Sequence, residues 1–239
     1  MATSLFLSAI LMAFSASPCR GQRVTEDRPV TMFRSISNKG PFNVIITMGT
    51  TEAVRVEADP TIIKYVETVV EPWFPLVLQV RFSNLLYNQP IPFFNGPINV
   101  YASAKALSNL ENQGSGPISL SPFLKAGDLQ ILISGSGDVQ VPMEASGLNI
   151  VISGSGNFFT NGTARNANIN ISGSGNFNGR DLRTQQTNVN IQGSGDVEVY
   201  TSTSLTVNID GSGDVRFGGQ PRVSQQINGS GGVFPSGTI

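Results

Sequence analysis

The chain has 239 residues, enough for one large all-β domain or two small ones. Its formal net charge is −1, only 13% of its residues are charged and no basic run is present, so a nucleic-acid-binding surface is not indicated. The chain contains no histidine, which removes imidazole from every catalytic or metal-binding role, including that of the base in a Ser-His-Asp triad.

Residues 1–21 are predicted to be a secretory signal peptide. Leu5–Ala16 is an apolar run of 12 residues, too short to cross a bilayer, and small residues follow it. Cleavage after Gly21 would remove Cys19, the only cysteine, so the mature protein would carry no disulfide. Lipid attachment to Cys19 is the rival interpretation, against which Pro18 argues. We predict a secreted protein, extracellular or at the cell surface, without a transmembrane segment after signal removal.

The segment before the repeats is predicted to close one end of the fold. Residues 22–29 are polar and are expected to form a disordered leader. Residues 30–105 are expected to form an N-terminal β cap that shields strand edges. Within this cap, alternating apolar residues on both sides of Gly49–Glu52 predict a β-hairpin. Asp59 followed by Pro60 predicts the start of one short helix.

Residues 83–97 interrupt the alternation, because apolar side chains are crowded among three prolines. One interpretation is an exposed aromatic loop that contacts a partner through Tyr87, Phe93 and Phe94. The other, which we favour, is that the loop folds back and adds its rings to the core of the cap.

A Gly-Ser-Gly triplet dominates residues 106–239. It occurs seven times, at intervals of 18 to 21 residues. A fixed period of about 20 residues is typical of a solenoid, in which each repeat packs on its neighbours. Apolar residues alternate before each triplet, as at Ile169 and Ile171, and another follows it, as at Phe177. Each repeat is therefore predicted to enter and to leave its turn as a strand.

Equivalent turns at one spacing predict strands stacked in parallel, one coil per repeat. The predicted fold is all-β, a right-handed parallel β-helix of about seven coils that forms a single domain over residues 30–239. Glycine suits the corners for two reasons: a sharp corner favours positive φ, and a missing Cβ lets stacked backbones approach closely. The predicted corner residues are Gly114, Gly116, Gly135, Gly137, Gly154, Gly156, Gly173, Gly175, Gly193, Gly195, Gly211, Gly213, Gly229 and Gly231.

From about Thr31 to Val233 the chain resembles the "putative auto-transporter adhesin, head GIN domain" family. This resemblance implies an export signal and a right-handed β-helix. It implies no catalytic residues, because the family has no established active site. The loop over 85–97 departs from the family's pattern, so no family-wide binding surface is carried over. The resemblance rests on the serial Gly-Ser-Gly-Asp and Gly-Ser-Gly-Asn corners and on Lys39–Ile46, Val54–Asp59, Gly179–Leu182 and Gly211–Pro221.

Acidic and amide residues follow most of the triplets. Stacking would place Asp196 and Asp214 about 5 Å apart, with Asp210 close by. Oxygen ligands of this kind suit Ca²⁺. The alternative, which we favour, is that these side chains hydrogen-bond to the turn backbone. No cofactor is predicted.

Three arginines, Arg165, Arg180 and Arg183, could lie on one side of neighbouring coils and bind an anionic sugar, or could be ordinary solvated turn residues. The acidic residues of the repeats are scattered, so no catalytic group is indicated. The sequence therefore predicts a non-enzymatic scaffold or adhesion module, with an extracellular glycan or surface protein as partner. The alternative is a carbohydrate-active protein that binds or cleaves polysaccharide. Self-association through the C-terminal end is a third hypothesis. Glycosylation sequons begin at Asn161, Asn170 and Asn228.

Overall fold

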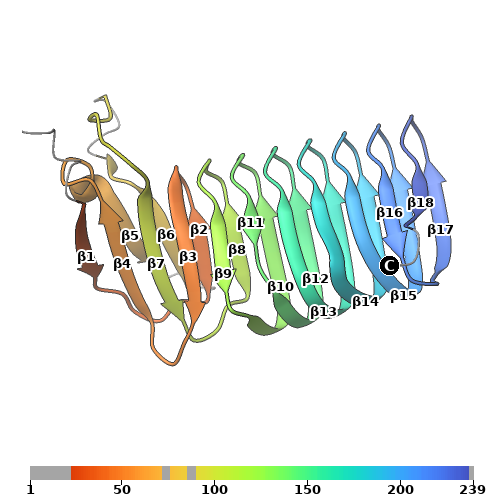
Figure 1. The fold of residues 1–239 in the computed structure, drawn as a ribbon, viewed down its shortest axis with the longest axis horizontal. Helices are drawn as coiled ribbons and strands as arrows, with labels where there is room; N and C mark the ends of the chain where they lie inside the picture. Colours follow the sequence, from red (N-terminus) through yellow and green to blue (C-terminus); the bar gives the residue numbers. More distant parts are fainter. Residues whose placement is uncertain (1–22, 72–75, 85–89, 237–239) are drawn as a thin grey trace, which may run out of the picture.

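The computed structural model describes residues 23–71, 76–84 and 90–236. Figure 1 shows one elongated body in which strands lie side by side along the whole length. The one helical element that lies wholly within the described residues is a single 3₁₀ turn, η1 (Ile63–Tyr65). Within the same ranges, no helix is long and apolar enough to span a membrane. The predicted signal peptide lies outside the described residues.

From residue 109 onward, each coil pairs in parallel with the coil before it. The register aligns Ile131 with Ile150, and Ile150 with Ile169, with no offset. The predicted parallel β-helix is confirmed. Its strands are β8 (Asn109–Asn112), β9 (Ile118–Ser121), β10 (Leu124–Ile133), β11 (Val139–Gln140), β12 (Met143–Ile152), β13 (Phe158–Ile171), β14 (Phe177–Ile191), β15 (Val197–Ile209), β16 (Val215–Gly218), β17 (Arg222–Ile227) and β18 (Val233–Pro235).

Rows of apolar side chains fill the inside of the coils, with one member of each row per coil. The residue two positions before each triplet forms one such row, and the second residue after it forms another. Phe158 and Phe177 are neighbours in the second row, with ring centroids 5.8 Å apart. The alternation in the sequence therefore predicted the buried rows correctly. Their buried members include Ile133, Ile152, Ile171, Ile191 and Ile209, and Val139, Phe158, Phe177, Val197 and Val215.

The Gly-Ser-Gly corners lie one above another in a single line, which Figure 1 shows along the upper edge. A Cβ on Gly154 would overlap the carbonyl oxygen of Gly135 in the coil below. The Ser155 amide donates a hydrogen bond of 3.1 Å to the same carbonyl. Close approach is thus the reason for glycine here. The expected positive φ is wrong, because Gly229 is the only corner glycine that has one.

The first coil of the stack lies within the segment that we assigned to the cap. β2 (Ser35–Asn38) pairs with both β6 (Val77–Phe82) and β8, so it lies between them. β3 (Phe42–Met48) lies in the same way between β7 (Ile98–Ala104) and β9. Residues 35–48 are therefore a coil, and the predicted boundary at residue 105 is wrong there. Its corner, Lys-Gly-Pro, lacks the triplet by which we identified the others.

The predicted hairpin around Gly49–Glu52 is also wrong. β7 pairs in parallel with β3 on one side and antiparallel with β4 (Ala53–Ala58) on the other, so it separates the two expected hairpin strands. The alternation predicted the strands but carries no information about their partners. The expected short helix is reduced to η1, before which Asp59 Oδ1 accepts a hydrogen bond of 2.9 Å from the Thr61 amide. The segment is completed by β5 (Val66–Glu71), which pairs antiparallel with β6.

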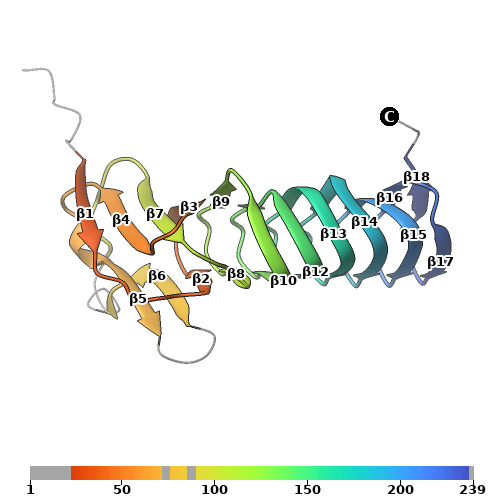
Figure 2. The ribbon, with the colours of Figure 1, turned by 90° about the horizontal axis from the view of Figure 1, so that it is seen from below.

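The expected disordered leader is ordered over β1 (Val24–Arg28), which pairs antiparallel with β4. Charged side chains join the two strands: Arg55 Nε lies 2.7 Å from Asp27 Oδ1, and Arg23 Nη1 lies 3.4 Å from Glu57 Oε1. A backbone ladder to β4, which Figure 2 shows beside β1, and the ion pairs hold this strand, and Val24 is its one apolar residue, partly buried against the core. The polar composition of residues 22–29 therefore concealed it.

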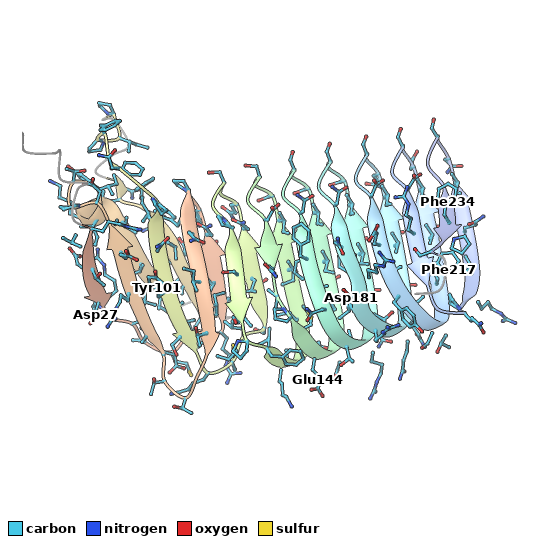
Figure 3. All side chains as sticks on the ribbon, in the orientation of Figure 1. Asp27, Tyr101, Glu144, Asp181, Phe217 and Phe234 are labelled. Atoms are coloured by element: carbon cyan, nitrogen blue, oxygen red, sulfur yellow. The ribbon has the colours of Figure 1, made fainter. Side chains whose placement is uncertain are left out.

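The last coil closes the other end of the stack less completely. β17 pairs with β15, and β18 pairs with β16. All residues of β17 except Ile227 are exposed. Figure 3 shows Phe217 and Phe234 near this end, where 48% of Phe234 is exposed. Self-association through this end remains a hypothesis that a light-scattering measurement would test.

Candidate functional site

The acidic and amide side chains that follow the corners form a hydrogen-bonded ladder along the stack. Asp196 Oδ1 accepts from the Asp214 amide at 2.8 Å, and Asp214 Oδ1 accepts from the Gly232 amide at 3.0 Å. The same contact joins Asp138 to Asn157, Asn157 to Asn176, and Asn176 to Asp196. Each side chain therefore satisfies a backbone N–H of the next coil.

Asp196 provides a test of this ladder. Asp196→Ala is expected to lower the free energy of unfolding by about 0.5–1.5 kcal/mol, because the Asp214 amide loses its acceptor. Asp196→Asn is expected to cost less, since Asn157 and Asn176 make the same contact. Denaturant titration of the three proteins measures both values. Equal losses for the alanine and asparagine variants would contradict the role of the side-chain oxygen.

The three calcium candidates do not lie together as the calcium hypothesis requires. Asp210 precedes its corner and lines a groove with Asn190 and Asn208, whereas Asp196 and Asp214 follow their corners. Among the residues that the structure describes, no three Cys, Asp or Glu side chains are grouped so that they could hold a metal ion. Asp196 and Asp214 accept hydrogen bonds from backbone amides of the next coil, whereas the interpretation that we favoured placed these bonds at the turn itself.

A long groove runs across the coils at the corner opposite the triplets. Its walls come from the same register position in successive strands, where Lys125, Glu144, Thr163, Arg183 and Tyr200 are aligned. Figure 3 shows Glu144 at the lower edge of the stack. We call this hollow of about 670 Å³ the corner groove. Its lining residues are Lys125, Ala126, Gly127, Glu144, Ala145, Ser146, Thr163, Ala164, Arg165, Arg183, Thr184, Gln185, Tyr200 and Ser202.

A second hollow of about 650 Å³ adjoins the corner groove, because Arg183, Tyr200 and Ser202 line both. We call it the bulge pocket. Figure 3 shows Asp181, one of its residues, on the wall above the lower edge. The two hollows together follow the stack from β10 to β16. The further residues of the bulge pocket are Arg180, Asp181, Glu198, Val199, Arg216, Gly218, Gly219, Gln220 and Ser236.

An arginine stacked on a tyrosine lies where the two hollows meet. Arg183 Cζ lies 3.7 Å from the centroid of the Tyr200 ring. On the next coil, a Cβ added to Gly218 would come within 2.8 Å of Tyr200 Cδ2, so glycine leaves room for the ring. The Tyr200 backbone is fixed as well, because its carbonyl accepts a hydrogen bond of 2.9 Å from Thr184 Oγ1. The guanidinium of Arg183 is therefore held in a defined orientation.

The bulge pocket owes its shape to extra residues in β14. The register steps from Gly179 opposite Val199 directly to Arg183 opposite Tyr200. Residues 180–182 thus have no partner in β15 and form a β-bulge, a feature that redirects side chains and is frequent beside functional sites. The bulge exposes Arg180 and Asp181 at the pocket.

Comparison with known proteins places the chain in a family. The family described as "Putative auto-transporter adhesin, head GIN domain" matches residues 32–221. The chain belongs to this family. The match confirms the resemblance that the corners and the Gly179–Leu182 segment indicated. A search of curated proteins finds no match.

Solved structures share the fold of this GIN-domain protein. A "putative adhesin" from Bacteroides fragilis is 21% identical with a TM-score of 0.83, and the alignment covers 90% of this chain and 97% of that one. A "putative adhesin" from Parabacteroides merdae gives 20% identity and a TM-score of 0.70 with the same coverage. A "putative lipid binding protein" from Parabacteroides distasonis gives 22% and 0.75, again with the same coverage. At these identities the likeness concerns the fold.

In the GIN-domain stack, the three predicted arginines line the two adjoining hollows. Arg165 and Arg183 both line the corner groove, and Arg180 and Arg183 both line the bulge pocket. Sequence reasoning missed Tyr200 and Arg216, which share these hollows. The bulge did leave a signal in the sequence: the interval from Gly173 to Gly193 is 20 residues, two more than the interval that follows it.

In the aromatic loop, one ring is exposed, as the partner-loop interpretation expects, and another packs against the core, as the interpretation that we favoured expects. Phe93 is 86% exposed, whereas Phe94 packs against the core. Tyr87 lies outside the described residues. Asp59 holds the loop, since its Oδ2 accepts from the Asn95 amide at 3.2 Å.

These contacts predict an acid-sensitive loop. Hydrogen bonds from the Thr61 amide and hydroxyl, and then from the Asn95 amide, hold the pKa of Asp59 below its ordinary value. A lowered folded-state pKa means that the ionised carboxylate stabilises the fold at neutral pH. This contribution is lost as the pH falls through the folded-state pKa. NMR titration of the Asp59 carboxyl carbon is expected to give a pKa below that of aspartate in unfolded peptides; a value at or above it would contradict the assignment.

A second surface of the stack carries rows of amides. Asn190 Nδ2 donates to Asn170 Oδ1 at 3.0 Å, and Asn208 Nδ2 donates to Asn190 Oδ1 at 2.9 Å. These amides line a groove of about 530 Å³, but they bond to one another along the stack. The sequon residue Asn170 belongs to this row, whereas the sequon residues Asn161 and Asn228 are exposed.

Proposed function

We propose that this protein is a secreted, non-enzymatic binding module of the adhesin type that acts at the cell surface or outside the cell. The observation that carries the proposal is the joined corner groove and bulge pocket. Between β10 and β15 they cross four strand spacings of about 4.8 Å, or about 19 Å. A hollow of this length, with charged, hydroxyl and aromatic side chains along it, suits an extended polymeric ligand.

The family supports a binding role, since its description and those of two of the solved structures speak of adhesins. The predicted signal peptide over residues 1–21 supports the location. The chain contains no histidine, so no imidazole can act as a catalytic base, which agrees with a binding role.

Binding of the purified full chain to an array of glycans and matrix proteins tests the proposal. We expect saturable binding to at least one polymeric surface ligand, and none by the heat-unfolded chain. Absence of binding to every glycan and matrix surface would contradict the proposal.

The carbohydrate-active alternative has one observation in its favour. Asp181 and Glu198 line the bulge pocket together, and cleavage of glycosidic bonds commonly uses two carboxylates. Incubation with a panel of polysaccharides, followed by an assay for reducing and unsaturated sugar ends, tests this alternative. We expect no release. Release that Asp181→Asn abolishes would establish the alternative instead.

A further inference from the structure

Among the described residues, three of the four guanidiniums around the two hollows form no ion pair. In the part of the chain that the structure describes, Arg165, Arg180 and Arg183 form no ion pair, and the Arg183 guanidinium stacks on the Tyr200 ring. Other cations nearby are paired: Lys125 Nζ lies 3.4 Å from Glu144, and Arg216 Nη2 lies 3.3 Å from Asp214. The side-chain N–H groups of the three arginines are thus not engaged by a carboxylate of any described residue.

The Arg183 guanidinium is preorganised for an anion. One face lies against the Tyr200 ring, which leaves its N–H groups free to bind two oxygens of one anionic group. Tyr200 in turn fits against Gly218. Ordering a long side chain before binding reduces the entropy that the ligand must offset.

Hydrogen-bond acceptors lie among these cations. Asp181 and Glu198 line the bulge pocket with Arg180 and Arg183. Ser202 lines both hollows, and its hydroxyl donates to the Thr184 carbonyl at 3.1 Å, so that its oxygen can accept from a ligand. Carboxylates accept hydrogen bonds from hydroxyl groups, which the sugars of a glycan carry in every unit. The mixture therefore favours a ligand that carries both anionic groups and hydroxyl groups.

We propose that the joined hollows bind an acidic glycan, with an anionic substituent of one sugar on Arg183 and those of neighbouring sugars near Arg165 and Arg180. This inference rests on the proposed binding function and names its ligand class. The anionic substituent is a carboxylate or a sulfate, both of which match the guanidinium.

Three polymers distinguish a carboxylate, a sulfate and no anionic substituent. They are polygalacturonate with carboxylates, dextran sulfate with sulfates, and neutral dextran. We expect the full chain to bind at least one of the polyanions in calorimetry, more weakly as salt rises, and to ignore dextran. The polyanion that binds more tightly identifies the substituent. Arg183→Ala is expected to lower the affinity about tenfold or more, because a charge-assisted contact is lost. Arg183→Lys is expected to give an intermediate loss, since lysine keeps the charge without the planar fork.

Arg34→Ala is the matched control, because Arg34 is an exposed arginine in the N-terminal part of the chain that forms no ion pair among the described residues. Its affinity is expected to equal that of the unmodified chain, and circular dichroism checks that all variants fold. Three results would overturn the inference: no binding to either polyanion, equal binding to dextran, or equal losses for Arg34→Ala and Arg183→Ala. Binding to a neutral glycan alone on the array would overturn the acidic-glycan inference and leave the binding function standing.

Discussion

Gly154→Ala is expected to lower the free energy of unfolding by about 3 kcal/mol or more, among the largest losses for any single methyl group added to this protein. The added Cβ would overlap the Gly135 carbonyl oxygen and meet the backbone of Ser134 in the coil below. These atoms belong to the stacked backbone, so they cannot move aside without separating two coils. Thermal and denaturant unfolding measure the loss.

Gly127→Ala is the matched control. Gly127 lies in the same stack, but a Cβ there meets no atom within 4 Å, and its φ is not positive. We expect a change of less than about 0.5 kcal/mol. If Gly154→Ala were tolerated as well as Gly127→Ala, the close approach of the corners would be wrong.

Phe158→Ala is expected to lower the free energy of unfolding by about 3–5 kcal/mol. The Phe158 ring is fully buried and packs against Phe177 in the row inside the coils. Removing it leaves a cavity that rows fixed by backbone pairing on both sides cannot fill. Urea denaturation, followed by circular dichroism, measures the loss.

The next residue in the chain provides the comparison. Phe159 points outward and is 38% exposed, so Phe159→Ala is expected to cost less than about 1 kcal/mol. Since the side-chain direction alternates along a strand, a reversed order of the two losses would mean that the strand register is shifted by one residue.

The repeated part of the fold could be predicted from the sequence because every coil obeys one rule. Ile169 and Ile171 lie inside, the glycines lie at the corner and Phe177 lies inside again, and the same holds one coil away. Repetition turns a weak local pattern into a reliable one. Our explanation of the corner was half right: contact between stacked backbones requires glycine, and positive φ does not.

The N-terminal part could not be predicted in this way, because its order in space differs from its order in the chain. The coil over 35–48 lies between strands that come later in the sequence. The alternation of apolar residues within a strand does not indicate which strands will lie beside it. β1 is held by Arg23 and Asp27 pairing with β4, so its composition resembles that of a loop.

The candidate site was only partly visible in the sequence. Arg165, Arg180 and Arg183 could be selected because they lie in neighbouring repeats. Their meeting with Tyr200 depends on the bulge at 180–182, which shifts the register between two coils. Interval lengths between triplets carry this information, but the residue at which the bulge forms is decided by packing against both neighbouring coils.

Disulfide cross-linking of neighbouring corners tests the stacked-coil arrangement most directly. With Cys19 replaced by serine, cysteines at the exposed positions Ser155 and Ser174 would lie in adjacent coils about 4.8 Å apart, within the range of a disulfide. Ser155 and Ser194 lie two coils apart, at about 10 Å, beyond that range. Oxidation is expected to join 155 to 174 rapidly and to leave 155 and 194 unjoined. Failure of the first pair to form, or equal formation of both, would contradict the stacked coils on which the groove and its ligand depend.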